Sequence, residues 1–227
     1  MKLALFIRGS GELPLSATYT EAIFPYPVRG AQESVGGVTT DFYYSDQWQV
    51  LEERAGGETM VQHVWSPVYV DALILRDRDT NGDGTRDERL WVVQDANYNV
   101  TALFDNAGNV VERYIYDPFG QVTVLTASWA VRSASAYAWV HLYQGGRFDA
   151  TSGLYHFRHR DYSPTLGRWT SLDPLSYAAG DVNLYRVMEN RPVGVTDPLG
   201  LYTPQEAWKY LTEEQQRKWK KLEEQGW

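Results

Sequence analysis

The chain has 227 residues, enough for one sizeable domain or for part of a larger protein. Its formal net charge of −8 disfavours nucleic acid and anionic membranes as partners. It contains no cysteine, which excludes disulfides and thiol catalysis in this chain. Aromatic residues make up 14%, beside 19 glycines and 10 prolines, and this mixture favours strands and turns over helices.

The N-terminal residues 1–40 carry weak structural signals. Their first apolar run stops at Arg8, which is shorter than the apolar region of a usual signal peptide. No run in the chain approaches the roughly 20 apolar residues of a membrane helix. We therefore expect neither a signal peptide nor a membrane span, and we predict a loop-rich segment over 1–40.

From residue 41 to residue 145, short aromatic and β-branched runs alternate with polar turns, a pattern that predicts β-hairpins. A unit of the form D-x-x-(G or Y)-x-V begins at Asp95, Asp105 and Asp117. In each unit the aspartate opens a turn through its side chain, and glycine adopts backbone angles that other residues avoid. One hairpin cannot bury both of its faces, so neighbouring hairpins must stack. The fold class expected is mainly β, with stacked or spiralling antiparallel hairpins.

One interval between two expected strands has the pattern of a calcium-binding loop, D-x-[DN]-x-[DN]-G-x5-E. Oxygen ligands at alternate positions and a glutamate at the twelfth position suit calcium. The flanking residues look like strands, whereas a loop of this type normally lies between helices. The alternative is a solvated acidic turn. The candidate ligands are Asp77, Asp79, Asn81, Asp83, Thr85 and Glu88.

Residues 146–201 are dense in fixed turns and aromatic side chains. Serine or aspartate precedes proline at positions 163, 173 and 197, and glycines recur between these turns. Such a density of turn residues predicts an irregular, tightly specified segment in place of a regular sheet or helix.

The motifs G-L-Y, R-D-Y-S-P-x-L-G-R-W, S-L-D-P, N-L-Y-R and D-P-L-G-L in this segment resemble the core segment of the RHS/YD-repeat proteins. The unit Y-I-Y-D-P-F-G before it resembles the YD signature itself. The resemblance implies that the segment plugs one end of a hollow shell made of spiralling hairpins. It further implies a cut after D-P-x-G-L that releases a variable C-terminal segment, often a toxin. The scaffold residues that it marks are Tyr116, Asp117, Gly120, Gly167, Arg168, Asp197, Pro198 and Gly200.

The same resemblance implies a self-cleavage site. Asp161 and Asp173 match the two catalytic aspartates of the family, and Arg160 matches the adjacent arginine. The bond cut would join Leu201 to Tyr202. Two adjacent carboxylates share a proton, so one activates a water while the other polarises the scissile carbonyl. The alternative is that Arg160 pairs with an acidic neighbour and that the aspartates before proline only open turns.

After Leu201 the composition changes, and Thr203-Pro204-Gln205-Glu206 has the form of a helix capping box. A short helical tail is therefore predicted over residues 202–227. The histidines at 141, 156 and 159 fit no metal-ligand spacing, so we expect structural roles for them. The tryptophans and tyrosines are expected in the core, with carbohydrate stacking as the alternative.

We expect the C-terminal part of an RHS shell, secreted or on the surface of a bacterium, that encloses a polymorphic cargo and cleaves itself. Its partners would be the upstream part of the same shell or its own C-terminal segment. The alternative is a non-enzymatic structural or cell-surface module with vestigial cleavage machinery. No cofactor is required in either case, and calcium would stabilise the alternative.

Overall fold

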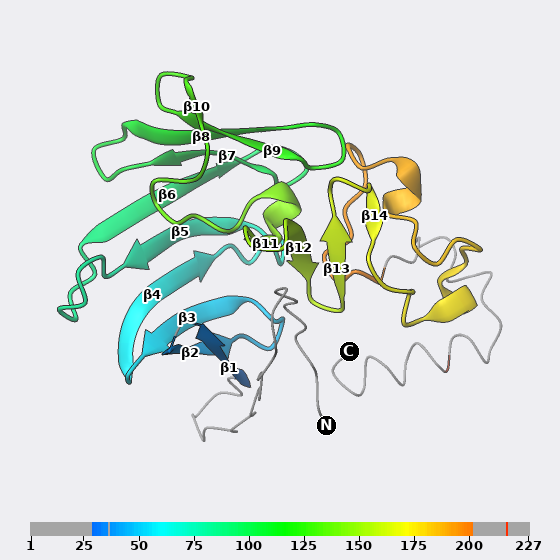
Figure 1. The fold of residues 1–227 in the computed structure, drawn as a ribbon, viewed down its shortest axis with the longest axis horizontal. Coiled ribbons are helices and arrows are strands. Elements are labelled where there is room, and N and C mark those ends of the chain that lie inside the picture. Colours follow the sequence, from blue (N-terminus) through cyan, green and yellow to red (C-terminus); the bar gives the residue numbers. More distant parts are fainter. Residues whose placement is uncertain (1–28, 36, 202–216, 218–227) are drawn as a thin grey trace.

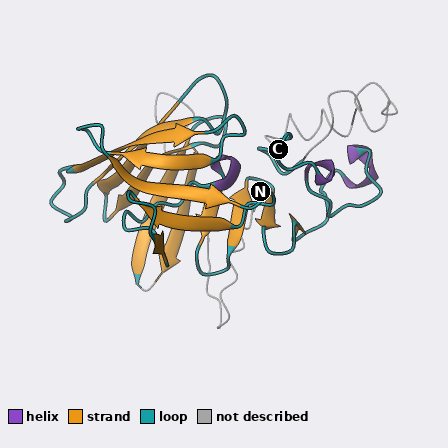
Figure 2. Ribbon diagram, turned by 90° about the horizontal axis from the view of Figure 1, so that it is seen from above, coloured by secondary structure: helices purple, strands orange, loops and turns teal. Residues whose placement is uncertain are grey.

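The computed structural model describes residues 29–35, 37–201 and 217. Two antiparallel sheets, one of ten strands and one of four, make up the regular structure of these residues. Figure 1 shows the ten strands stacked in chain order, with the four-stranded sheet beside them. The helical turns are short, and in Figure 2 one lies close to the ten-stranded sheet while the others lie away from it. The predicted fold class, mainly β with stacked antiparallel hairpins, is confirmed.

In the ten-stranded sheet each strand pairs with its neighbour along the chain, in the order β1 to β10. Short turns join most of the strands, so the sheet is a continuous series of hairpins. The strands are β1 (Arg29–Val35), β2 (Val38–Tyr44), β3 (Val50–Ala55), β4 (Glu58–Trp65), β5 (Leu73–Arg78), β6 (Glu88–Gln94), β7 (Val100–Phe104), β8 (Val110–Tyr116), β9 (Val122–Thr126) and β10 (Val131–Arg132).

The repeated D-x-x-(G or Y)-x-V units form three turns of the same design. In each, the aspartate carboxylate accepts hydrogen bonds from the backbone N–H groups two and four residues later. The fourth residue has a left-handed backbone, with φ of 61° at Tyr98, 82° at Gly108 and 87° at Gly120. The repeat therefore specifies its turns locally, through one side chain and one backbone conformation.

Residues 137–201, which follow the ten-stranded sheet, are called the closing segment below. It contains β11 (Arg147–Asp149), β12 (Leu154–Phe157), β13 (Arg160–Ser163) and β14 (Arg168–Trp169), which pair in that order. It also contains the 3₁₀ turns η1 (Tyr143–Gly145), η2 (Ser176–Ala179) and η3 (Met188–Asn190). The segment expected to be irregular thus has a small sheet at its centre.

The closing segment packs directly on the last repeat turn. Three of its tyrosine hydroxyls, from Tyr143, Tyr162 and Tyr155, donate to the successive carbonyls of residues 118, 119 and 120 at 3.2, 2.7 and 3.0 Å. A Cβ on Gly120 would lie 2.5 Å from the Tyr143 ring, so only glycine fits there. These aromatic side chains share one buried cluster with Leu103 of the ten-stranded sheet. The aromatic residues therefore form the core that joins the two sheets.

Two boundaries differ from those expected. The first strand begins at Arg29, inside the segment 1–40 that was expected to be loop-rich, because pairing with β2 organises residues whose own pattern is weak. The regular hairpins end at Arg132 with β10, before residue 145. The predicted helical tail over 202–227 lies outside the described residues, apart from residue 217. Among the described residues, no helix is long and apolar enough to cross a membrane.

Candidate functional site

The candidate site is centred on the buried guanidinium of Arg160 in β13. One nitrogen, Nη2, lies 2.8 Å from a carboxylate oxygen of Asp173 and 3.7 Å from one of Asp197. The guanidinium also stacks over the Trp169 ring, with its central carbon 4.4 Å from the ring centroid. Two buried carboxylates from distant turns therefore converge on one cation.

Local structure explains why these groups point inward. Side chains alternate across β13, so Arg160 and Tyr162 both enter the core, and both are buried. Asp173 begins the turn of the S-L-D-P motif, where its carboxylate accepts the N–H of Leu175 at 2.8 Å. Burial raises the pKa of Asp173, and the Arg160 guanidinium opposes part of that rise. Burial also lowers the pKa of Arg160.

The D-P-L-G-L motif folds back onto this site. The Leu201 N–H donates to the Asp197 carboxylate at 3.0 Å, and the Gly200 carbonyl accepts a hydrogen bond from Nε of Arg160. Gly200 has φ of 67°, and a Cβ there would lie 2.8 Å from the Phe157 carbonyl oxygen. The Leu201 side chain is buried against Leu175 and Ala179. The residue before the predicted cut is therefore fixed within a few ångströms of Arg160.

Asp161 does not lie beside Asp173, where its predicted catalytic role would require it. It alternates with Arg160 along β13, so its side chain lies on the opposite face of the small sheet. There it lies 2.9 Å from Nδ1 of His156, the residue opposite it on β12. Of the predicted catalytic residues, the structure brings Arg160 and Asp173 together beside the predicted cleavage-site residue Leu201, whereas Asp161 contacts His156. Tyr202, on the other side of the predicted cut, lies outside the described residues.

The carboxylate that shares Arg160 with Asp173 is instead Asp197. The sequence marked Asp197 only as the first residue of a turn motif. It does open that turn, since its carbonyl accepts the Gly200 N–H at 3.3 Å. Nothing in its local pattern indicated the second contact, because Arg160 precedes it by 37 residues (197 − 160).

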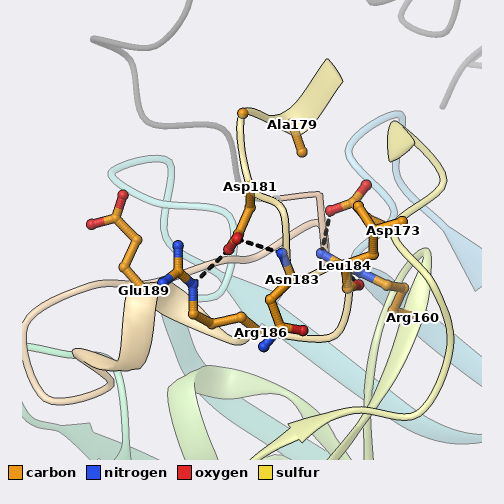
Figure 3. Close-up of a pocket in the computed structure, with 9 residues that line it drawn as sticks. Arg160, Asp173, Ala179, Asp181, Asn183, Leu184, Arg186 and Glu189 are labelled. Carbon is orange, nitrogen blue, oxygen red and sulfur yellow. Dashed lines mark hydrogen bonds and ion pairs between the residues drawn. The ribbon is translucent and has the colours of Figure 1, made fainter. Parts of the chain in front are cut away.

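A small cavity of about 40 Å³ adjoins the Arg160–Asp173 pair, and Figure 3 shows the side chains around it. The volume is sufficient for a water molecule, and most of its lining is polar. On its far side Arg186 pairs with Asp181 at 2.6 Å. Ala179 lines the cavity and belongs to the same buried apolar cluster as Leu201, so the cavity lies close to the motif.

The other predicted scaffold residues occupy contact positions between segments. The Tyr116 hydroxyl donates to the Val100 carbonyl at 2.7 Å. Gly167 has φ of 61° and lies close to the Phe119 ring, where a Cβ would be 3.2 Å from it. The Arg168 guanidinium stacks over the Tyr185 ring, with its central carbon 4.5 Å from the ring centroid.

The carboxylates of the predicted calcium loop have protein partners. Asp79 accepts the backbone N–H groups of residues 81, 82 and 84, an arrangement that shapes the turn. Asp77 forms two hydrogen bonds with Arg89, both of 2.7 Å, and Glu88 pairs with Arg76 and with residue 78. Within the described part of the chain, no three histidine or acidic residues are grouped as a metal site would require. Calcium binding stays a prediction.

The histidines at 141, 156 and 159, for which structural roles were expected, lie in the described fold beside the fourth histidine, His63. His141 is buried, and its ring meets that of His63 on β4 edge to face, with centroids 5.1 Å apart. Burial lowers the pKa of His141 to about 4 and holds the pKa of His63 well below its usual value. Burial likewise lowers the pKa of His159 to about 4. His156 is the partner of Asp161 described above.

A continuous series of antiparallel hairpins, closed by a segment docked on its last repeat turn, defines a repeat-shell type of β protein. The sequence model of the Teneurin YD-shell matches residues 32–193. This chain therefore belongs to the Teneurin YD-shell family, and the expected RHS/YD-repeat membership is confirmed.

Curated relatives agree with this assignment. Toxin subunit YenC2 of Yersinia entomophaga is 38% identical over 117 residues, which are 51% of this chain and 11% of the relative. The tRNA3(Ser)-specific nuclease WapA of Bacillus spizizenii is 30% identical over 185 residues, 79% of this chain and 7% of the relative. Teneurin-1 of Homo sapiens is 27% identical over 121 residues, 51% of this chain and 4% of the relative. The chain thus spans about a tenth or less of the length of these relatives.

Solved structures share the fold. A TcdB2-TccC3 crystal structure matches with a TM-score of 0.53 at 24% identity, covering 77% of this chain and 8% of that one. A Photorhabdus luminescens Tc holotoxin pore matches with a TM-score of 0.54 at 20% identity, covering 82% and 8%. At this level of identity the comparison establishes the architecture of the chain.

Proposed function

We propose that this chain is the closing part of an RHS shell that encloses a polymorphic C-terminal cargo, secreted or at a bacterial surface. The observation that carries the proposal is the docking of residues 197–201 at the buried Arg160 site, which anchors the point where the cargo segment would begin. Family membership and the presence of toxin subunits among the relatives support it. Its partner would be the upstream part of the same shell, next to the edge strand β1.

We further propose that the chain cleaves itself between Leu201 and Tyr202. Water would add to the Leu201 carbonyl and the peptide bond would break, giving a carboxyl on Leu201 and an amine on Tyr202. Asp173, whose pKa is raised by burial, is suited to give or take a proton, and the adjoining cavity has room for the water. Arg160 would stabilise the negative charge that develops.

Asp161 is the second carboxylate implied by the resemblance. In this role it would have to turn away from His156 toward Asp173. Asp197 offers a carboxylate that already lies beside Arg160. The three aspartates can be separated experimentally, because their contacts differ. Asp161 contacts His156, whereas Asp173 and Asp197 share Arg160 but accept different backbone N–H groups, those of residues 175 and 201.

Intact mass spectrometry at neutral pH tests the cleavage. We expect the wild type to lose residues 202–227, and Asp173→Asn to stay full length. Asp161→Asn decides whether the resemblance assigns the second acid correctly, and Asp105→Asn, in an exposed repeat turn, is the matched control. Neutral pH matters because Asp-Pro bonds break in acid without an enzyme.

The second candidate function is a structural or cell-surface interaction module that does not cleave itself. The specific observation in its favour is that Asp161 and Asp173 lie in separate contacts, one with His156 and one with Arg160. A wild-type chain that circular dichroism shows to be folded, and that keeps its full mass over days at neutral pH, would leave this function in place of self-cleavage.

A further inference from the structure

The turn between β12 and β13 binds the D-P-L-G segment along its backbone. Three successive residues, the two of the turn and the first residue of β13, donate to three successive carbonyls. Nη1 of Arg158 donates to the Pro198 carbonyl at 2.6 Å, the His159 N–H donates to the residue 199 carbonyl at 3.2 Å, and Arg160 donates to Gly200. This series fixes both the position and the register of the residues that precede the predicted cut, as a binding site fixes a peptide.

The first of these donors also contacts the ten-stranded sheet. Arg158 forms a two-pronged ion pair with Asp71, at 2.7 and 3.2 Å, in the loop that leads into β5. Its Nε donates to the Gln47 carbonyl, in the turn between β2 and β3, at 3.3 Å. Asp71 is itself buried against the closing segment, since a Cβ on Gly145 would lie 2.6 Å from it. One guanidinium thus joins two loops of the hairpin sheet to the motif.

The backbone of Arg158 supports the same conclusion. Its φ of 49° lies in the left-handed region, which a long side chain rarely occupies. Such a conformation persists where the surroundings fix it, and it is common at functional sites. Here the conformation directs one side chain to Asp71 and to Pro198 at the same time.

We propose that Arg158 is a positioning residue that places the D-P-L-G-L segment correctly only when the hairpin sheet has folded around Asp71 and Gln47. The consequence for cleavage rests on the proposed self-cleavage: a chain without the assembled sheet would present its cut site poorly. Cleavage would then follow shell assembly and would not precede it. Arg158 does not touch the reacting bond in this proposal; it acts through the segment that it holds.

Hydrogen exchange of the full chain tests the positioning without relying on cleavage. The backbone N–H groups of Gly200 and Leu201 bond to Asp197, so their exchange reports whether the motif is held. We expect Arg158→Gln and Asp71→Asn to speed this exchange by about tenfold or more, because each removes a charged hydrogen bond. Arg89→Gln is the matched control, since it breaks an equally two-pronged Arg–Asp pair that does not contact the motif.

Arg158→Lys separates positioning from mere stability. Lysine keeps the charge next to Asp71 but lacks the planar fork that reaches Pro198 as well. We expect its melting temperature to stay near that of the wild type while exchange at residues 200 and 201 rises. Unchanged exchange in folded Arg158→Lys and Arg158→Gln chains would overturn the proposal, and if Arg158→Gln fails to fold, the lysine variant decides.

Cleavage is then measured on the same samples by intact mass. We expect the cleaved fraction per hour to fall in Arg158→Lys in step with the rise in exchange, with no change in Arg89→Gln. Faster exchange with an unchanged cleavage rate would overturn the link to cleavage. If the wild type does not cleave, self-cleavage fails as a function, while the exchange result still decides whether Arg158 positions the motif.

Discussion

The hairpin sheet and the closing segment are specified in opposite ways. In the sheet, an aspartate such as Asp105 organises its turn through N–H groups at most four residues away, and each strand pairs with its chain neighbour. In the closing segment, Arg160 depends on Asp173 and Asp197, and Arg158 bonds to Asp71, 87 residues earlier. The comparison teaches that a repeated local pattern can build a scaffold, whereas a site requires unique residues from distant turns.

The strongest test of this difference removes one arginine from each region. Arg160→Met leaves two buried carboxylates without their cation, and we expect a loss of about 3–5 kcal/mol in the free energy of unfolding. Arg89→Met breaks an exposed pair on the hairpin sheet and should cost far less, because water solvates the aspartate that remains. Urea denaturation of both variants measures the two losses. Equal losses would mean that the Arg160 site is not the more tightly coupled one.

A second test compares two turns of the repeat itself. Gly108 and Gly120 have the same left-handed backbone, so alanine at either position meets the same local strain. At Gly120 the added methyl group would also meet the Tyr143 ring, whereas Gly108 faces open space. We expect Gly120→Ala to lose about 1–3 kcal/mol more than Gly108→Ala, from the overpacking. Thermal melts of the two variants give the difference, and similar melting temperatures would show that the closing segment does not press on this turn.

The junction between the regions should respond to acid. The pKa of His141 is near 6.5 in the unfolded chain, but burial lowers this pKa to about 4 in the folded chain. Unfolding therefore takes up a proton in this window, so stability is fully present above pH 6.5 and falls as pH drops toward 4. We expect a loss of about 1–2 kcal/mol from this group between pH 7 and pH 5.

The control for this prediction is His141→Asn. Its amide can still donate to the Gly145 carbonyl, which the ring nitrogen Nδ1 contacts at 3.2 Å. The melting temperature of this variant should fall less between pH 7 and pH 5 than that of the wild type. An identical fall in both proteins would place the acid sensitivity elsewhere.

The smallest expected effect concerns calcium. Asp77 and Glu88 are engaged with arginines, and Asp79 is engaged with its own turn. We therefore expect millimolar calcium to change the melting temperature by no more than about 1 °C, because the ion would have to displace these partners. A rise of several degrees that Glu88→Gln abolishes would instead support the calcium loop.

The sequence predicted the hairpins well because their determinants are local. The carboxylates of Asp95, Asp105 and Asp117 accept hydrogen bonds from N–H groups at most four residues away. The repeat could therefore be recognised from the sequence alone. The resemblance located Arg160, Asp173 and the D-P-L-G-L motif, and the structure brings these together.

The contacts of Asp161 and Asp197 could not be read in the same way. Two adjacent residues of a strand point to opposite faces, so the neighbouring Arg160 and Asp161 separate once β13 forms. The choice of Asp197 as the second carboxylate at Arg160 depends on how the chain returns after η3. The path of the chain after η3 is a tertiary feature, and the periodicity of the sequence does not predict it.

The strictly sequential strand order also governs how the molecule can be made. Hairpins between chain neighbours have low contact order, so they can form one after another as the ribosome delivers the chain. The closing segment is synthesised after the sheet, and its partners Asp71 and Pro118 lie in turns that precede Arg158 and Tyr143 by 87 and 25 residues. Folding should thus begin with the sheet, which forms fast from local hairpins, and docking of the closing segment should follow as a slower step.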